Sequence, residues 1–350
     1  MPDGPRLADL TTLRVGGPAQ RFVRAETEAE LVAAVAAADD VGEQLLVVGG
    51  GSNLLVADEG FPGTVAQVAT DGVEVGRDGD AALVTVQAGT VWDDVVARAV
   101  AEGWSGIEAL SGIPGSVGAT PIQNVGAYGQ EVSATIASVR VWDRRLRGVR
   151  RFAGHECSFG YRHSRFKADP SRFVVLDVTF RLAHDPLGQP VRYAELARAL
   201  GVEPGERAPL ADVRAAVLRL RSGKGMVLDA ADHDTWSAGS FFTNPVLDAA
   251  AAAALPEGAP RYPQPDGGVK TSAAWLIERA GFGKGFALPS AGDGAPAPAS
   301  LSTKHTLALT NRGSATAADL LALARHVRAG VETRFGIRLV NEPVLVNCTL

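Results

Sequence analysis

Residues 103–129 read GWSGIEALSGIPGSVGATPIQNVGAYG, a turn-rich and apolar stretch. It holds too many glycines for a helix, lacks the alternation of a strand and carries too few charges for a solvated linker. A long loop of this kind inside a compact domain is usually functional. Glycine accounts for 40 of the 350 residues, against roughly 7% in average usage. The chain therefore relies on tight turns and close backbone approaches.

A second glycine-rich segment is VVGGGSNLLV at residues 47–56. It begins with the end of a run at residues 44–48 (QLLVV) that predicts a short buried strand. Glycines after a strand let consecutive backbone N–H groups converge on a phosphate, and Ser52 and Asn53 add side-chain donors. The segment does not have the GxGxxG spacing. The glycines alone leave two explanations open, a phosphate cradle and a simple turn between two strands.

Helices and strands are expected to alternate around these loops. A helix is predicted at residues 27–40, with Thr27 as N-cap and Glu30 in position for a capping box. The other helices are predicted at residues 91–102, 193–200, 209–221, 249–254 and 317–333. Strands are predicted at residues 44–48, 82–88, 139–142, 173–182 and 343–347. Residues 184–190 are expected to form a connector, and residues 286–300 a loop rich in proline, glycine and alanine.

Length, charge and cysteine content indicate the number of domains and argue against several functions. At roughly 150 residues per domain, the chain is expected to form two or three domains. The net charge of −5 indicates no broad basic surface, which argues against nucleic-acid binding. Cys157 and Cys348 form no CxxC, so neither a disulfide framework nor a metal site is predicted. No secretory signal or membrane span is recognisable, and a cytoplasmic location is expected.

Several common catalytic motifs are missing from the sequence. Lys224 and Lys284 each follow a glycine, but glycine rather than serine or threonine comes next, so neither lies in a P-loop. Ser105 and Ser116 lie outside any GxSxG motif. The six histidines do not pair at metal-ligand spacing. P-loop, serine-hydrolase and zinc-enzyme functions are therefore disfavoured.

Three polar residues stand out in apolar or glycine-rich surroundings. Arg162 lies in FGYRHSRFK, Ser240 in WSAGSFFTNP and Glu342 in LVNEPVLV. Each has a structural explanation, respectively an ion pair, a satisfied turn and a charge on an edge strand. Taken together they indicate a site, because a hydroxyl and a carboxylic acid in dry surroundings suit proton delivery.

Seven motifs follow one another along the chain: TTLRVGGPA, VVGGGSNLLV, LSGIPGSVGATPIQNVGAYG, GYRHSRFK, SAGSFFTNP, KTSAAWLIERAGFGKG and LSTKHTLALTNRG. With this set the chain resembles the MurB family, the UDP-N-acetylenolpyruvoylglucosamine reductases of bacterial cell-wall synthesis. The resemblance runs from about residue 13 to residue 346. The combination of GSFF and NP with the long glycine loop is far more specific than any single glycine motif.

The resemblance implies an α+β fold. An FAD-binding region of the vanillyl-alcohol-oxidase (PCMH) type, in two subdomains, is followed by a C-terminal α+β substrate-binding domain. The expected boundaries are residues 1–185 for the FAD-binding domain, with subdomains at about 1–66 and 67–185, residues 186–222 for a connector with a substrate loop, and residues 223–350 for the substrate-binding domain. Non-covalent FAD, NADPH as co-substrate and a monomer are expected.

The resemblance assigns FAD binding to the two glycine-rich loops. The first loop contributes Gly49, Gly50, Gly51, Ser52, Asn53 and Leu54. The second contributes Ser111, Gly112, Ile113, Pro114, Gly115, Ser116, Gly118, Ala119, Gln123, Asn124, Gly126 and Tyr128.

The implied reaction has two halves, reduction of FAD by NADPH and reduction of the enolpyruvyl double bond by reduced FAD. It converts UDP-N-acetyl-3-O-(1-carboxyvinyl)glucosamine to UDP-N-acetylmuramate, a peptidoglycan precursor. By motif, Arg162 is the arginine at the substrate carboxylate, Ser240 the proton donor and Glu342 the glutamate that assists it. A fixed guanidinium stabilises the charge that develops at the carboxylate. The implied substrate contacts are Tyr161, Tyr193, Lys224, Asn244 and His305.

Some features depart from the family pattern or specify a subtype. Tyr193, in YAEL, implies the subtype that retains a substrate-covering loop, and Lys224 suits the pyrophosphate as a mobile point charge. Thr243 stands where many relatives have lysine. The segment between Lys224 and Ser240 and the loop at residues 286–300 are longer than in compact family members.

Two alternative functions stay open at this point. One is another FAD-dependent oxidase or dehydrogenase of the same fold, which the lack of a histidine for covalent flavin in the glycine loops disfavours. The other is a nonenzymatic UDP-sugar binder, which the intact set of Arg162, Ser240 and Glu342 disfavours.

Overall fold

The computed structural model describes residues 4–264, 267–289 and 296–350, and the chain divides into two compact units. The first unit comprises residues 19–50 and 62–227 together with Gly4. The second comprises residues 5–18, 51–61 and 228–350. Part of the loop predicted at residues 286–300, namely residues 290–295, lies outside the described residues.

The compact units differ from the predicted domain boundaries. Residues 5–18 and 51–61, which the sequence assigns to the FAD-binding domain, belong to the second unit. The connector at residues 186–222 belongs to the first unit. The reason for the first difference is a parallel pairing of β3 (Leu54–Val56) with β18 (Val344–Val346), which joins two distant parts of the chain.

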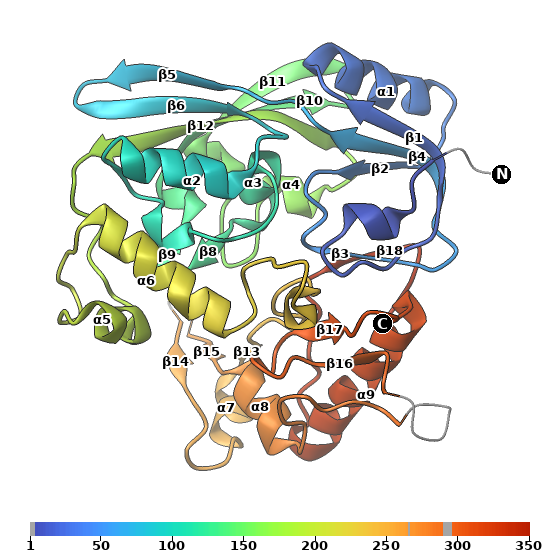
Figure 1. Ribbon diagram of the computed structural model, residues 1–350, viewed down its shortest axis with the longest axis vertical. Coiled ribbons are helices and arrows are strands. Elements are labelled where there is room, and N and C mark those ends of the chain that lie inside the picture. The colour runs from blue at the N-terminus through green and yellow to red at the C-terminus, as the bar shows by residue number, and fades with distance from the viewer. Residues whose placement is uncertain (1–3, 265–266, 290–295) are drawn as a thin grey trace. The chain divides into compact units, whose positions relative to one another are not determined.

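A six-stranded antiparallel sheet forms the framework of the first unit (Figure 1). The strand order is β11-β10-β12-β6-β5, and β7 pairs with β12. The strands are β5 (Val73–Asp78), β6 (Ala81–Gln87), β7 (Trp104–Ser105), β10 (Ile136–Asp143), β11 (Gly148–Ala153) and β12 (Phe173–His184). Strands are predicted at residues 82–88 and 139–142, and in the structure the alternation of apolar residues in β6 and β10 buries one face of this sheet.

A smaller three-stranded sheet, in the order β1-β4-β2, carries α1 (Glu28–Asp40). Its strands are β1 (Ala19–Ala25), β2 (Leu45–Val48) and β4 (Phe61–Val68). The Thr27 hydroxyl accepts the Glu30 N–H at 3.2 Å, and the Glu30 carboxylate accepts the Thr27 N–H at 3.0 Å. These reciprocal bonds confirm the predicted capping box.

The remaining elements of the first unit surround the long glycine loop. The helices are α2 (Trp92–Ala101), α3 (Thr120–Gln123), α4 (Arg165–Ala168), α5 (Ala194–Leu200) and α6 (Leu210–Gly223). A short antiparallel hairpin is formed by β8 (Gly126–Ala127) and β9 (Gln130–Glu131). The main apolar core lies between the large sheet and α2, where the rings of Trp92 and Phe180 are 5.6 Å apart.

Residues 186–209, called the arm below, belong to the first unit and fold back on themselves. Its two limbs are joined by the bonds Gly188 N–H to Ala208 O and Val191 N–H to Glu206 O, both 2.8 Å. The arm carries α5 and packs on α6 through a small core of its own. That core comprises Ala109, Val191, Leu196, Ala197, Ala208, Val213, Ala216 and Val217.

Short strands and α-helices make up the described part of the second unit. Besides β3 and β18, its strands are β13 (Val246–Leu247), β14 (Tyr262–Pro263), β15 (Val269–Lys270), β16 (Ala299–Leu301) and β17 (Leu309–Asn311). Its helices are α7 (Ala249–Ala253), α8 (Ala273–Arg279) and α9 (Ala317–Phe335). Phe241 and Phe242 lie in the core of this unit with Leu276 of α8 and Leu320 of α9. In the described part of the chain, no helix is long and apolar enough to cross a membrane.

Candidate active site

The two glycine-rich loops meet inside the first unit. Gly49 and Gly50 directly follow β2 and lie against Gly115 and Ser116 of the long loop. A Cβ added to Gly50 would stand 2.7 Å from the Gly115 Cα, and one added to Gly49 would stand 2.1 Å from the Ser116 Oγ. The first of these collisions is with rigid backbone. Glycine is therefore required at position 50 for the loops to approach each other.

Backbone donors are available where these loops meet. Among the described residues, the N–H groups of Gly50, Gly115 and Ser116 make no hydrogen bond, whereas Val117 and Gly118 donate to carbonyls at 2.9 and 2.8 Å. Neighbouring unpaired N–H groups in a glycine-rich turn form a concave anion site. This arrangement fits the phosphates of a dinucleotide such as FAD.

The rest of the first loop is held in the second unit. Gly51 has φ +60°, and a Cβ there would stand 1.7 Å from the Leu10 carbonyl oxygen. The Asn53 carbonyl accepts the Val344 N–H at 2.9 Å, and the Asn53 amide donates to the Glu342 carbonyl at 3.4 Å. Residues 51–54 are thereby fixed beside β18.

Two helices anchor the long loop from outside. Gly112 N–H donates to Asp93 of α2 at 2.6 Å, and Arg214 of α6 donates to the same carboxylate at 2.7 Å. Burial alone raises the pKa of Asp93, but the bonds from Arg214 and Gly112 outweigh it, so the pKa lies below its ordinary value. The Ser111 hydroxyl is also used within the loop, where it donates to the Glu108 carbonyl at 2.7 Å.

Arg162 occupies the tip of a tight turn. Gly160 and His163 exchange two backbone hydrogen bonds of 3.1 Å, and Arg162 between them has φ +51°. A positive φ is uncommon for a residue other than glycine. The guanidinium donates to the carbonyls of Gly126, at 3.2 Å, and Asn124, at 3.5 Å. The turn therefore directs Arg162 towards the long glycine loop.

Asn124 couples the Arg162 turn to the β8–β9 hairpin. It is 1% exposed, and its amide donates to the Glu131 carboxylate and the Gly160 carbonyl, both at 2.9 Å. The hairpin, Tyr161 and Arg162 line an open cavity of about 450 Å³. Arg162 is thus presented to a space large enough for part of a ligand.

Three of the predicted ligand-binding residues gather beside the arm. The rings of Tyr128 and Tyr193 meet edge to face, with centroids 5.5 Å apart. The Lys224 Nζ lies 5.7 Å from the centre of the Tyr128 ring and forms an ion pair with Glu195. Burial raises the pKa of Tyr128 to about 12, so this phenol stays protonated at neutral pH.

Ser240 and Glu342 belong to neighbouring segments of the second unit. Glu342 N–H donates to the Phe241 carbonyl at 2.8 Å, and Thr243 N–H donates to the Val340 carbonyl at 3.0 Å. This antiparallel pairing brings Glu342 next to the residue that follows Ser240. Phe241, between the two, is 1% exposed. The Thr243 hydroxyl, at the position of the family lysine, donates to the Val340 carbonyl at 3.3 Å.

The other two predicted substrate contacts of the second unit are held near the same segment. The Asn244 side-chain oxygen accepts the N–H of Ala273, the first residue of α8, at 2.9 Å. Phe241 N–H donates to the Leu307 carbonyl at 2.7 Å, which fixes the turn that contains His305. No group of three or more His, Cys, Asp or Glu residues among those described could hold a metal ion.

Comparison with known proteins assigns the family. Residues 19–145 match an FAD binding domain, and residues 231–346 match the C-terminal domain of UDP-N-acetylenolpyruvoylglucosamine reductase. A protein of that name from Streptomyces avermitilis is 60% identical and aligns with 99% of this chain and 95% of its own length. One from Cutibacterium acnes is 59% identical, with 98% of this chain and 90% of its own length aligned. The chain belongs to the UDP-N-acetylenolpyruvoylglucosamine reductase family.

A solved member of the reductase family has the same fold. The crystal structure of UDP-N-acetylenolpyruvylglucosamine reductase (MurB) from Thermus caldophilus is similar with a TM-score of 0.66 and 28% identity, covering 98% of this chain and 97% of the other. The predicted α+β fold with an FAD-binding region is confirmed, as is the predicted class, an FAD-dependent oxidoreductase. The roles of individual residues stay predictions.

The residues that hold the site in place were not predicted from the sequence. Asp93 and Arg214 fix the long glycine loop, and Glu108 and Gln130 tie that loop to the hairpin and the arm. A signal for Glu108 was present in the sequence, because a lone acid between Ile107 and Ala109 is unusual in an apolar loop. Asp93 and Arg214 gave no such signal, since charged residues are common on helices.

Proposed function

We propose that the chain reduces UDP-N-acetyl-3-O-(1-carboxyvinyl)glucosamine to UDP-N-acetylmuramate in peptidoglycan precursor synthesis, with FAD as cofactor and NADPH as reductant. The observation that carries this proposal is the full-length relationship to reductases of that name, at 60% identity over 99% of the chain. A cytoplasmic location and a monomeric state remain predictions of the sequence.

The glycine loops supply the cofactor site in this proposal. The unpaired N–H groups of Gly50, Gly115 and Ser116 would hold the pyrophosphate of FAD. When bound, FAD provides the two-electron chemistry that joins oxidation of NADPH to reduction of the substrate double bond. The chain binds and orients this cofactor, and its own side chains manage charge and protons.

Arg162 is assigned to the carboxylate of the substrate. Reduction at C3 of the enolpyruvyl group leaves negative charge that spreads into this carboxylate. A guanidinium already oriented by the Gly126 carbonyl can stabilise that charge without reorganising. The strained turn at φ +51° is the cost of that orientation.

Ser240 is assigned to deliver the proton to C2, with Glu342 as its supporting acid. A serine hydroxyl is a weak acid in water, so it needs a strong partner and the exclusion of solvent. The buried Phe241 and the pairing of Phe241 with Glu342 support both requirements. Asn244 and His305, on adjoining segments, are assigned to the substrate.

Lys224, Tyr193 and Tyr161 are assigned to the UDP-sugar. An ammonium is a compact, mobile charge that suits a pyrophosphate. Lys224 already has an anionic partner in Glu195, so the phosphate would share or displace that carboxylate. Tyr193 stands at the start of α5 and is 48% exposed, as a residue of a substrate-covering arm should be.

The proposal is tested by the absorbance spectrum of the purified protein. We expect a flavin spectrum that bleaches when NADPH is added without oxygen and returns when the enolpyruvyl UDP-sugar is added. A colourless protein would exclude a flavoenzyme. Bleaching that is reversed by oxygen but not by the UDP-sugar would indicate an FAD-dependent oxidase instead.

A further inference from the structure

Glu108 is a buried carboxylate for which the proposed reaction has no use. It follows β7 at the beginning of the long glycine loop and is 1% exposed. Within the part of the chain that the structure describes, no arginine or lysine pairs with it. Burying a carboxyl group without a cation costs folding free energy unless hydrogen bonds satisfy its oxygens.

Three hydrogen bonds converge on this carboxylate. One oxygen accepts Gly106 N–H at 2.6 Å. The other oxygen accepts the side-chain amide of Gln130 at 2.7 Å and the backbone N–H of Gln189 at 2.6 Å. All three partners are donors, so both oxygens of the Glu108 side chain act as acceptors.

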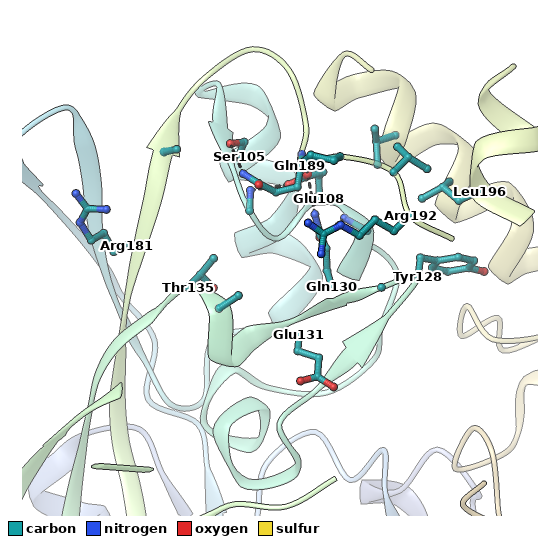
Figure 2. A pocket seen from close by; sticks show the side chains of 18 residues that line it. Ser105, Glu108, Tyr128, Gln130, Glu131, Thr135, Arg181, Gln189, Arg192 and Leu196 are labelled. Atoms are coloured by element: carbon teal, nitrogen blue, oxygen red, sulfur yellow. Dashed lines mark hydrogen bonds between the residues drawn. The ribbon is translucent and has the colours of Figure 1, made fainter. Parts of the chain in front are cut away.

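The three donors come from three different parts of the first unit. Gly106 belongs to the long glycine loop, Gln130 to β9 and Gln189 to the first limb of the arm. Figure 2 shows Glu108 with Gln189 and Gln130 around it on the wall of a cavity of about 350 Å³. Glu108 is therefore a junction of loop, hairpin and arm.

Each of the segments joined at Glu108 carries a predicted ligand-binding residue. Tyr128 lies in the turn of the β8–β9 hairpin, two residues before Gln130. Tyr193 lies four residues after Gln189, and its ring contacts that of Tyr128 at 5.5 Å. Glu195, in the first turn of α5, pairs with Lys224. The position of all these groups depends on where the hairpin and the arm are tied.

We propose that Glu108 is a positioning residue that fixes Tyr193 and Lys224 relative to the long glycine loop, and so sets affinity for the UDP-sugar. It touches neither substrate nor cofactor in this role. The inference rests on the proposed function for its ligand, while the junction itself rests on the hydrogen bonds alone.

The test compares Glu108→Gln with a matched control, Gln189→Ala. In Glu108→Gln an NH2 group replaces one of the two acceptor oxygens. At least one of the three N–H donors then has no acceptor, so the segment that carries it is released. Gln189→Ala removes only the 3.3 Å bond from the Gln189 side chain to Ser105 and leaves the backbone N–H on Glu108. Four measurements are made: FAD content, the rate of flavin reduction by NADPH, steady-state kinetics that give KM and kcat, and amide exchange in residues 186–209.

For Glu108→Gln we expect KM for the UDP-sugar to rise about tenfold or more, with kcat changed by less than about threefold. FAD content and flavin reduction by NADPH should match the wild type, and amides of the arm should exchange faster. Gln189→Ala should match the wild type in all four measurements. Unchanged KM and exchange in Glu108→Gln would overturn the proposal, as would loss of FAD, because Glu108 would then be a general structural residue.

Two further outcomes are separated by the design. If Glu108→Gln does not fold, the second variant is Gln130→Leu. It removes the bonds of the Gln130 side chain to Glu108 and to the Ala109 N–H, and leaves the bond of the arm to Glu108 in place. It should raise KM by a smaller factor with kcat preserved; an equal fall in kcat and FAD content would overturn the role. If the wild type does not turn over the UDP-sugar, the proposed function fails. The amide-exchange comparison then still decides whether Glu108 ties the arm.

Discussion

The two compact units carry candidate functional groups of different kinds. In the first unit the groups that we propose to act are backbone N–H donors, left unpaired where the glycine loops contact each other. In the second unit they are the side chains of Ser240 and Glu342, set by a short antiparallel pairing. A site made of backbone is damaged by adding atoms, and a site made of side chains is damaged by removing them. The expected defects therefore differ in kind, loss of cofactor in one case and loss of one chemical step in the other.

The largest effect is expected from adding atoms to the glycine loops. Gly50→Val places a Cβ 2.7 Å from the Gly115 Cα, so one loop must move and the N–H groups no longer converge. We expect the variant to purify without flavin, as measured by absorbance. The control is Gly76→Val in β5, where a Cβ has no neighbour closer than 3.9 Å and flavin content should be unchanged. A yellow Gly50→Val protein would show that the N–H groups of this loop do not hold the cofactor.

A smaller effect, confined to turnover, is expected at Arg162 in the first unit. Arg162→Lys keeps the positive charge but loses the planar fork that binds a carboxylate through two bonds. We expect kcat to fall by about 100-fold and KM to change far less. Flavin content should stay the same. His163→Ala, in the same turn, is the control; a similar loss of kcat in that variant would mean that the turn rather than the guanidinium is responsible.

Affinity alone is expected to change at Lys224. Lys224→Ala removes one charge from the proposed pyrophosphate site, so KM for the UDP-sugar should rise about tenfold with kcat almost unchanged. The exposed Lys284 of the second unit is the matched control for loss of a lysine. An unchanged KM in Lys224→Ala would remove the pyrophosphate assignment.

The smallest effect on the reaction is expected from a substitution that lowers the stability of the first unit at a position outside its glycine-rich loops. Hydrogen bonds from Arg172 hold the pKa of the buried Asp143 at about 2, below its ordinary value. Such a group stabilises the folded state above the unfolded pKa of about 4, and the stabilisation is lost as pH falls through the folded pKa. Asp143→Asn should lower the free energy of unfolding by about 2 kcal/mol at pH 7. Urea unfolding should show this difference shrinking between pH 4 and pH 2, with kcat unaffected at pH 7.

Local patterns predicted much of the fold. The capping box of Thr27 and Glu30 fixed the start of α1, because both partners lie within one helical turn. The apolar residues of β12 predicted its strand at residues 173–182, and the structure extends it to His184. These features depend on neighbours in sequence, which a periodicity analysis detects.

What the sequence did not reveal depends on contacts between distant segments. The pairing of β3 with β18, which moves residues 51–61 into the second unit, has no local signature. The same is true of the collision between Gly50 and Gly115 that makes glycine obligatory, since glycine permits many conformations and specifies none. The site residues came from the family resemblance, whereas the hydrogen-bond partners of Glu108, which we propose to position them, lie on segments that only the structure brings together.

The assignment of Ser240 as the proton donor is tested most directly by Ser240→Ala in stopped-flow absorbance. This measurement resolves both halves of the reaction on one sample. Proton delivery to C2 has no counterpart when NADPH reduces the flavin. We expect bleaching by NADPH at the wild-type rate, and reoxidation by the enolpyruvyl UDP-sugar slowed by roughly 100-fold or more, the usual scale for losing a positioned proton donor. Glu342→Gln should follow the same pattern. Equal slowing of both steps, or reoxidation at the wild-type rate, would contradict the assignment of Ser240 as the acid.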